Sequence, residues 1–260
     1  MTDLRDVLVI TDLDGTLLDH ATYAWAAATP ALDLLRMSGA GLILASSKTA
    51  AEIAPLRDEI GFTDWPSIVE NGSGLLGAEA GNETYMRLRR AIKDLPQGFH
   101  GFGDMDAQEV SERTGLSLEA AERAKTRQYS EPGLWTGAPD DLRGFIEAAT
   151  TAELTAQQGG RFVSLSFGGT KAQRAKELIR RLAPAHTIIL GDAPNDAGML
   201  DLADSGVIVA NPASGEMPRL PVEDTGRIRR TQKPGPAGWS DAVLDIVQEL
   251  EDRKDKRANG

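Results

Sequence analysis

The sequence predicts an α/β protein in which a parallel-sheet core is interrupted by an inserted α+β cap. Residues 1 to about 80 alternate short apolar runs with helical patterns, and the alternation returns after Lys171. This alternation is typical of a parallel sheet. Residues from about 82 to 168 read instead as amphipathic helices with two strands. That change of pattern indicates an insert that splits the core.

The strands expected in the core are continuous apolar runs, because a parallel strand is covered on both faces. They are 7–11, 41–45, 67–70, 187–190 and 207–209. The core helices are expected at 29–38, 49–60, 172–182 and 239–251. Trp239, which follows a turn-rich loop, is expected to be a packing anchor.

The insert is expected to contain four amphipathic helices and two strands. The helices are 85–95, 107–114, 118–124 and 142–149, and the strands lie near 133–136 and 161–166. The last charged run, 251–257, has no apolar face, so we expect a frayed helix end or a tail there.

Composition excludes several classes of function. The chain of 260 residues has no cysteine and three scattered histidines, which excludes disulfide and thiolate chemistry and argues against zinc. Its net charge of −11 repels nucleic acid and anionic membranes, so neither is expected as a partner. No apolar segment reaches membrane-spanning length and the start carries no signal-peptide pattern, so a cytoplasmic location is expected.

Carboxylates follow two of the predicted core strands. Asp12 and Asp14 come directly after the first strand, and Asp192 and Asp196 follow the run 187–190. A single Asp-x-Asp-Gly segment is equally well explained as a turn. Two acidic strand ends in one chain favour a site for a hard cation such as Mg²⁺, because the carboxyl ends of parallel strands meet at one edge of the sheet.

Cationic and hydroxyl side chains stand where a phosphate could be bound. The strand 41–45 ends in Ser46, Ser47 and Lys48, which suit phosphate oxygens at a helix N-terminus. Lys171, before a helical pattern, offers a second fixed cation. Taken alone, Lys171 is also explained as a solvated lysine at a helix start, and Ser46 as a helix N-cap.

Together these motifs resemble those of the haloacid dehalogenase superfamily of phosphatases. The matching motifs are Asp12-Leu13-Asp14-Gly15-Thr16, Ser46, Lys171 and Gly191-Asp192-x-x-Asn195-Asp196. Further blocks resemble the mannosyl-3-phosphoglycerate phosphatase family: 11–20, 46–49, 68–72, 101–105 and 159–162. The resemblance implies a Rossmann-like catalytic core, residues 1–81 and 169–260, with an inserted α+β cap domain, residues 82–168.

The resemblance also implies a role for each site residue. Asp12 would be the nucleophile that forms an aspartyl-phosphate. Asp14 would protonate the leaving oxygen and then deprotonate the attacking water. Mg²⁺ would be held by Asp12, the Asp14 carbonyl and Asp192, with Asp196 either a direct ligand or, like Asn195, in the surrounding layer. Lys171 would neutralise Asp12 and phosphate, and Ser46 would donate to a phosphoryl oxygen with help from Ser47 and Lys48.

The expected substrate is a small phosphorylated sugar-glycerate, mannosyl-3-phosphoglycerate or its glucosyl relative. Arg161 is either an ordinary exposed residue or the partner of the glycerate carboxylate. Ala172 and Gln128 stand where the family usually has glycine and an acid, and the second departure bears on substrate identity. A phosphatase of another sugar phosphate, a phosphosugar mutase and a non-catalytic phosphosugar-binding protein remain the alternatives.

Overall fold

Five parallel strands form the sheet of the first of two units in the computed structural model, which describes residues 3–77, 82–159, 161–215 and 217–258. This unit comprises Met1–Ser46, Arg57–Pro66 and Lys171–Gly260. Its strands are β1 (Val7–Asp12), β2 (Gly41–Ala45), β9 (His186–Gly191), β10 (Ser205–Ala210) and β11 (Ile228–Pro234). They lie in the order β11-β10-β9-β1-β2 and pair in parallel.

The central strand β1 carries the first acidic motif. All six of its residues are buried, as expected for a parallel strand covered on both faces. Asp12 pairs with Ala45 of β2, and Thr11 pairs with Leu190 of β9. This register aligns the carboxyl ends of the three strands, so Asp12, Ser46 and Asp192 emerge at one edge of the sheet.

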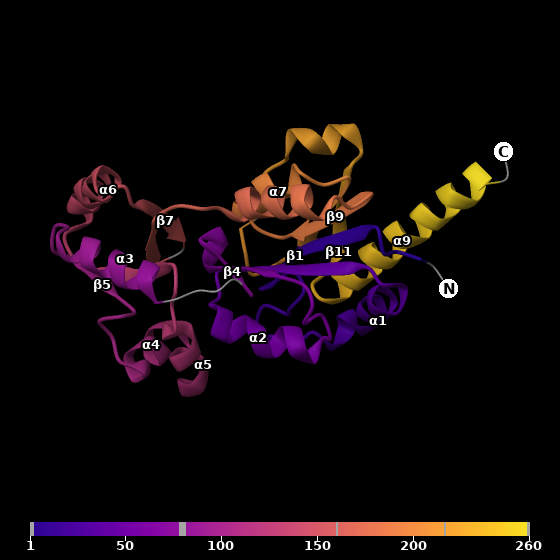
Figure 1. The fold of residues 1–260 in the computed structure, drawn as a ribbon. Coiled ribbons are helices and arrows are strands. Elements are labelled where there is room, and N and C mark those ends of the chain that lie inside the picture. The colour runs from indigo at the N-terminus through magenta and orange to yellow at the C-terminus, as the bar shows by residue number, and fades with distance from the viewer. Residues whose placement is uncertain (1–2, 78–81, 160, 216, 259–260) are drawn as a thin grey trace. The chain divides into compact units, whose positions relative to one another are not determined.

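Helices cover both faces of this sheet: α1 and the long α9 lie on one side, and α7 lies on the other (Figure 1). The helical elements of the unit are η1 (Ala26–Ala28), α1 (Thr29–Ser38), α7 (Lys171–Leu182), η4 (Pro194–Asp196), α8 (Ala197–Leu200), η5 (Pro221–Thr225) and α9 (Ala237–Ala258). Helix α9 has buried residues in its first half, which include Trp239, Val243, Ile246 and Val247. These residues anchor its first half to the sheet.

The second unit comprises Ser47–Leu56 and Ser67–Thr170 and contains a separate antiparallel sheet. That sheet has the order β5-β6-β8-β7, formed by β5 (Phe99–Gly101), β6 (Ser130–Trp135), β7 (Thr155–Gly159) and β8 (Phe162–Ser166). Its other elements are β3 (Ser67–Val69), η2 (Glu70–Gly72), β4 (Gly74–Leu76), α3 (Glu83–Lys93), α4 (Ala107–Thr114), α5 (Leu118–Lys125), η3 (Pro139–Asp141) and α6 (Leu142–Thr151). Helix α2 (Ala50–Glu59) begins in this unit, and its last residues belong to the first.

Two apolar clusters sandwich the antiparallel sheet. Val163 and Leu165 of β8 pack with Leu88 of α3 and Phe145 of α6. Phe162 packs instead with the cluster of α4 and α5, which includes Val110 and Ala121. The division follows from the alternation of a strand, in which neighbouring side chains point to opposite faces.

The structure confirms the α/β class, with a parallel core sheet and a separate antiparallel sheet. It adds four strands that the apolar pattern did not predict: β4, β5, β7 and β11. Two of them, β7 and β11, are edge strands whose residues are largely polar and exposed, so they lack the apolar signal of a central strand. The helix predicted at 239–251 continues to Ala258 in α9, so the run 251–257 is helical, and fraying of this end stays a prediction.

The predicted division into a core of residues 1–81 and 169–260 and a cap of residues 82–168 stays a prediction. Its first boundary falls beside residues 78–81, which lie outside the described residues. The two units found here instead place β3, β4 and the start of α2 with the insert.

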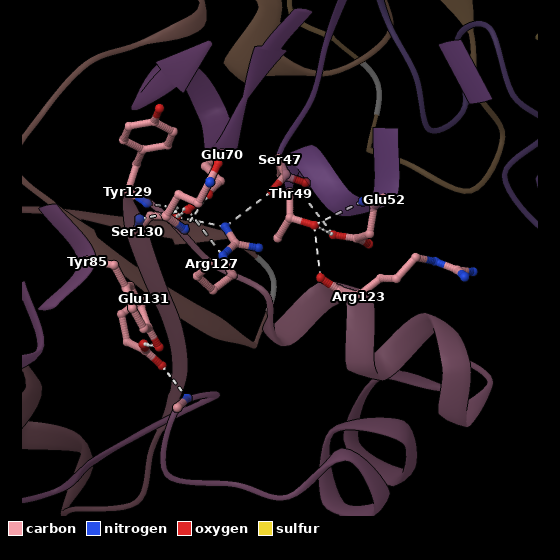
Figure 2. A network of polar contacts seen from close by, with 12 residues as sticks. Ser47, Thr49, Glu52, Glu70, Tyr85, Arg123, Arg127, Tyr129, Ser130 and Glu131 are labelled. Carbon is pink, nitrogen blue, oxygen red and sulfur yellow. Dashed lines mark hydrogen bonds and ion pairs between the residues drawn. The ribbon is translucent and has the colours of Figure 1, made fainter. Parts of the chain in front are cut away.

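A buried polar network ties three segments of the second unit together (Figure 2). The Glu70 carboxylate accepts backbone N–H bonds from Gln128, Tyr129 and Ser130 at 2.9, 3.1 and 2.7 Å. Arg127 forms an ion pair with Glu70, with 3.3 Å between Nε and Oε2, and donates to the Ser47 carbonyl. Both side chains are buried. Glu70 therefore holds the start of β6, and Arg127 holds the loop after β2.

We expect Arg127→Met to destabilise the second unit by about 3–5 kcal/mol, because it leaves the buried Glu70 carboxylate without its cation. The measurement is the free energy of unfolding in urea. Glu119→Gln is the matched control, since it breaks an exposed ion pair with Arg123 and should cost less than about 1 kcal/mol. An equal loss of unfolding free energy in the two variants would show that the buried ion pair stabilises the protein no more than the exposed one.

Candidate active site

Three carboxylates converge at the edge where β1 and β9 end. Asp12, Asp192 and Asp196 each contribute a carboxylate oxygen to a group in which all atoms lie within 4.8 Å of one another. All three residues are buried, with Asp196 only 1% exposed. Buried carboxylates at this distance repel one another, so the arrangement needs positive charge beside it.

Lys171 supplies one such charge. As the first residue of α7 it is 4% exposed, and its ammonium donates to Asp12 Oδ1 and, at 2.9 Å, to Asp196 Oδ1. Burial by itself disfavours the charged form, but Asp12 and Asp196 outweigh it and hold the pKa of Lys171 well above its usual value. The explanation of Lys171 as a solvated lysine at a helix start is therefore wrong.

The charge balance of the cluster remains negative. Burial raises the pKa of Asp12 well above its usual range; Lys171 opposes this, and the neighbouring Asp196 and Asp192 carboxylates raise it further. A second cation would relieve this repulsion. Because every side-chain donor in the group is a carboxylate oxygen, with no nitrogen or sulfur ligand, the residues fit a hard divalent cation such as Mg²⁺.

Neutral donors fix the Asp192 carboxylate in place. Thr16 Oγ1 donates to Asp192 Oδ1 at 2.8 Å, and Asn211 Nδ2 donates to Asp192 Oδ2 at 2.7 Å. Gly15 makes this packing possible, since a Cβ at that position would lie 2.1 Å from Asn211 Nδ2. Hydrogen bonds of this kind orient the carboxylates that hold a metal.

Asn211 escaped the sequence analysis, although a signal for it exists. It directly follows β10, the strand next to β9 in the sheet, so it occupies a strand end like Asp12 and Asp192. An amide at that position fits the rule that ligands bind at the carboxyl ends of parallel strands.

Asp196 is held by its own loop as well as by Lys171. Its Oδ2 accepts the backbone N–H groups of Asp192 and Ala193 at 3.2 and 3.3 Å. A Cβ at Gly191 would lie 2.5 Å from the Asp196 Cβ, so this close packing requires glycine. Whether Asp196 ligates a metal directly stays a prediction.

The remaining predicted residues of the first unit have varied environments. Asp14 is half-buried in the turn after β1, where Gly15 adopts a φ of 85° and its N–H donates to the Leu18 carbonyl at 2.9 Å. Ser46 is buried, and Asn195 is exposed in η4. Their roles stay predictions.

The explanation of Ser46 as a helix N-cap does not hold. Thr49 caps α2 instead, since its hydroxyl accepts the Glu52 N–H at 3.1 Å, and its own N–H donates to the Glu52 carboxylate at 2.8 Å. This is a reciprocal capping box.

Ser47, Lys48 and Arg161 belong to the second unit, and their part in substrate binding stays a prediction. Ser47 is exposed and Lys48 is half-buried. Arg161 is exposed in the turn before β8, with its guanidinium carbon 5.4 Å from the centre of the Phe162 ring. Gly160, within the predicted 159–162 block, lies outside the described residues.

Comparisons with known proteins agree with this fold and show the family. A sequence profile of the haloacid dehalogenase-like hydrolases matches residues 9–93. A glucosyl-3-phosphoglycerate/mannosyl-3-phosphoglycerate phosphatase of Methanococcoides burtonii is 33% identical over an alignment that covers 92% of this chain and 97% of that protein.

Two solved phosphatases share the fold at lower identity. The sucrose-phosphatase of Synechocystis, solved with sucrose and phosphate, is 19% identical with a TM-score of 0.59, covering 95% of this chain and 98% of its own. A subclass IIB sugar phosphatase of the haloacid dehalogenase superfamily is 17% identical with a TM-score of 0.57, covering 94% of this chain and 98% of its own.

The chain therefore belongs to the haloacid dehalogenase-like hydrolases and is a phosphatase of that type. The Methanococcoides enzyme extends the likeness over nearly the whole length of both chains, as the motif blocks of the mannosyl-3-phosphoglycerate phosphatase family predicted. In the part of the chain that the structure describes, no helix is long and apolar enough to cross a membrane.

Proposed function

We propose that this protein is a Mg²⁺-dependent phosphatase that hydrolyses the phosphomonoester of a sugar-glycerate, mannosyl-3-phosphoglycerate or glucosyl-3-phosphoglycerate. The observation that carries the reaction type is the buried Asp12–Lys171 pair beside Asp192 and Asp196 at the ends of parallel strands. The relative of similar length, named for these two substrates, supports the choice of substrate.

In this proposal Asp12 attacks phosphorus and forms an aspartyl-phosphate, while the sugar-glycerate oxygen leaves with a proton from Asp14. Asp14 then takes a proton from water, which attacks the acyl phosphate and restores the Asp12 carboxylate with release of inorganic phosphate. The Lys171 ammonium supports this sequence, since it lies on the Asp12 carboxylate and would also face the phosphoryl charge.

The carboxylate cluster fits the metal that such chemistry uses. Asp12, the Asp14 carbonyl and Asp192 would hold Mg²⁺, with Asp196 a further candidate, and the bound ion would supply positive charge to the phosphoryl oxygens. Ser46, Ser47, Lys48 and Asn195 are the candidates to donate to the phosphate.

Asp12→Asn should abolish turnover while leaving the melting temperature close to that of the wild type, because asparagine has the same shape and Asp196 still pairs with Lys171, whereas an amide is a poor nucleophile. Phosphate release from the sugar-glycerate phosphate is the measurement, and Asp64→Asn at an exposed position is the control. Retention of more than about one-hundredth of the activity would exclude covalent catalysis through Asp12. Transfer of the phosphoryl group back to sugar, without phosphate release, would favour the mutase.

Removal of the metal with EDTA should abolish phosphatase activity, and titration with Mg²⁺ should restore that activity. Ca²⁺ should restore it poorly, because Ca²⁺ is larger and less strict about octahedral geometry. Isothermal titration of Mg²⁺ into the stripped protein gives a readout independent of turnover, and Asp192→Asn should weaken that binding. Full activity in metal-free buffer would contradict the proposal.

Arg161→Ala should lower kcat/KM for the sugar-glycerate phosphates by about 100-fold while barely changing that for p-nitrophenyl phosphate, which has no carboxylate. The fork of an arginine side chain pairs a planar carboxylate through two hydrogen bonds. Arg143→Ala, at another exposed arginine of the same unit, is the matched control. Equal losses on both substrates would mean that Arg161 does not recognise the glycerate.

A further inference from the structure

We infer that Trp239, at the start of α9, is a positioning residue for the nucleophile. It acts through the hydroxyl of Thr11 on the backbone carbonyl of Asp12. The inference rests on the proposed function, since it takes Asp12 as the attacking group.

A chain of two hydrogen bonds links the three residues. The indole Nε1 of Trp239 donates to Thr11 Oγ1 at 2.9 Å, and Thr11 Oγ1 in turn donates to the Asp12 carbonyl oxygen at 2.8 Å. Trp239 and Thr11 are both completely buried. Each bond is directional and shielded from water, so the chain restricts the peptide plane that follows Asp12.

The geometry of the strand gives this restriction a consequence for catalysis. Thr11 and Asp12 are neighbours on β1, so their side chains point to opposite faces of the sheet. Thr11 meets Trp239 of α9 on one face, whereas the Asp12 carboxylate meets Lys171 of α7 on the other. Lys171 thus holds the carboxylate, and Trp239 holds the backbone from which that carboxylate projects.

The loop before α9 also contacts the turn that follows β1, at Gly15 and Thr16. A Cβ at Gly235 would lie 2.1 Å from the Thr16 carbonyl oxygen and 2.8 Å from that of Gly15. Only glycine permits so close an approach of two backbones. This explains the turn-rich stretch before Trp239, which sequence analysis treated only as a loop.

A packing role alone does not account for the residue types. Thr11, the last but one residue of a buried strand, carries a hydroxyl that valine would lack, and a buried indole N–H needs an acceptor. The two groups satisfy each other, and the hydroxyl retains a hydrogen for the Asp12 carbonyl. The acceptor of that hydrogen is the backbone carbonyl of the proposed nucleophile, so the pair that satisfies the buried indole also holds the Asp12 backbone.

The test compares Thr11→Val, Thr11→Ser, Trp239→Phe and the Thr11→Val/Trp239→Phe double variant in the full chain with Mg²⁺. Turnover of p-nitrophenyl phosphate and thermal melting are measured for each. Trp135→Phe is the matched control, because it removes another indole hydrogen bond, to the Ala138 carbonyl at 2.9 Å, in the second unit.

We expect Thr11→Val and Trp239→Phe each to lower kcat by about 10-fold or more with KM within about twofold, since small misplacement of a reacting group is costly. Thr11→Ser, which keeps the hydroxyl, should stay near wild-type kcat. The double variant should be no slower than the slower single variant, because both changes break one chain.

The inference would be overturned if Thr11→Val folds and keeps the wild-type kcat. It would also be overturned if the fold-losses in kcat of the two single variants multiply in the double variant, or if Trp135→Phe loses as much kcat as Trp239→Phe. If Trp239→Phe does not fold, the contrast between Thr11→Val and Thr11→Ser decides. Failure of the proposed function shows separately, as absence of phosphatase activity in the wild type or its persistence in Asp12→Asn.

Discussion

The buried contact of Lys171 with Asp12 and Asp196 is the constraint on which the first unit depends. Asp12 and Lys171 stand 159 positions apart, with the whole insert between them. An ammonium and carboxylates can lose their water only when they meet, so the ion pair requires β1, α7 and the loop after β9 to assemble together.

The group of Asp12, Asp192 and Asp196 concentrates negative charge in a protein whose net charge is already −11. Three carboxylates face one ammonium, and the raised pKa of Asp12 reflects the cost of keeping them together out of water. Neutral partners spread this charge: Thr16 and Asn211 bind Asp192, and backbone N–H groups bind Asp196. Such an arrangement is poor for stability but well suited to attract a divalent cation.

The fold by itself does not determine the substrate. Phosphatases at 17% and 19% identity share the architecture over nearly the whole chain, and folds of this kind host many specificities. In the second unit, the Glu70 carboxylate fixes the backbone of Gln128 and Tyr129 from a turn in which Glu70 and Asn71 adopt φ values of 50° and 58°. A rigid backbone there lets side chains vary without loss of position.

The sequence by itself determined the strands with continuous apolar runs, the two acidic strand ends and the order of the motifs, because these signals lie within a few neighbouring residues. Only the tertiary structure decided which partners meet across the chain: Asn211 on Asp192, and Trp239 on Thr11. It also decided the polar edge strands β7 and β11. Their residues carry no apolar period, since an edge strand forms through hydrogen bonds to a neighbour that is specified elsewhere in the chain.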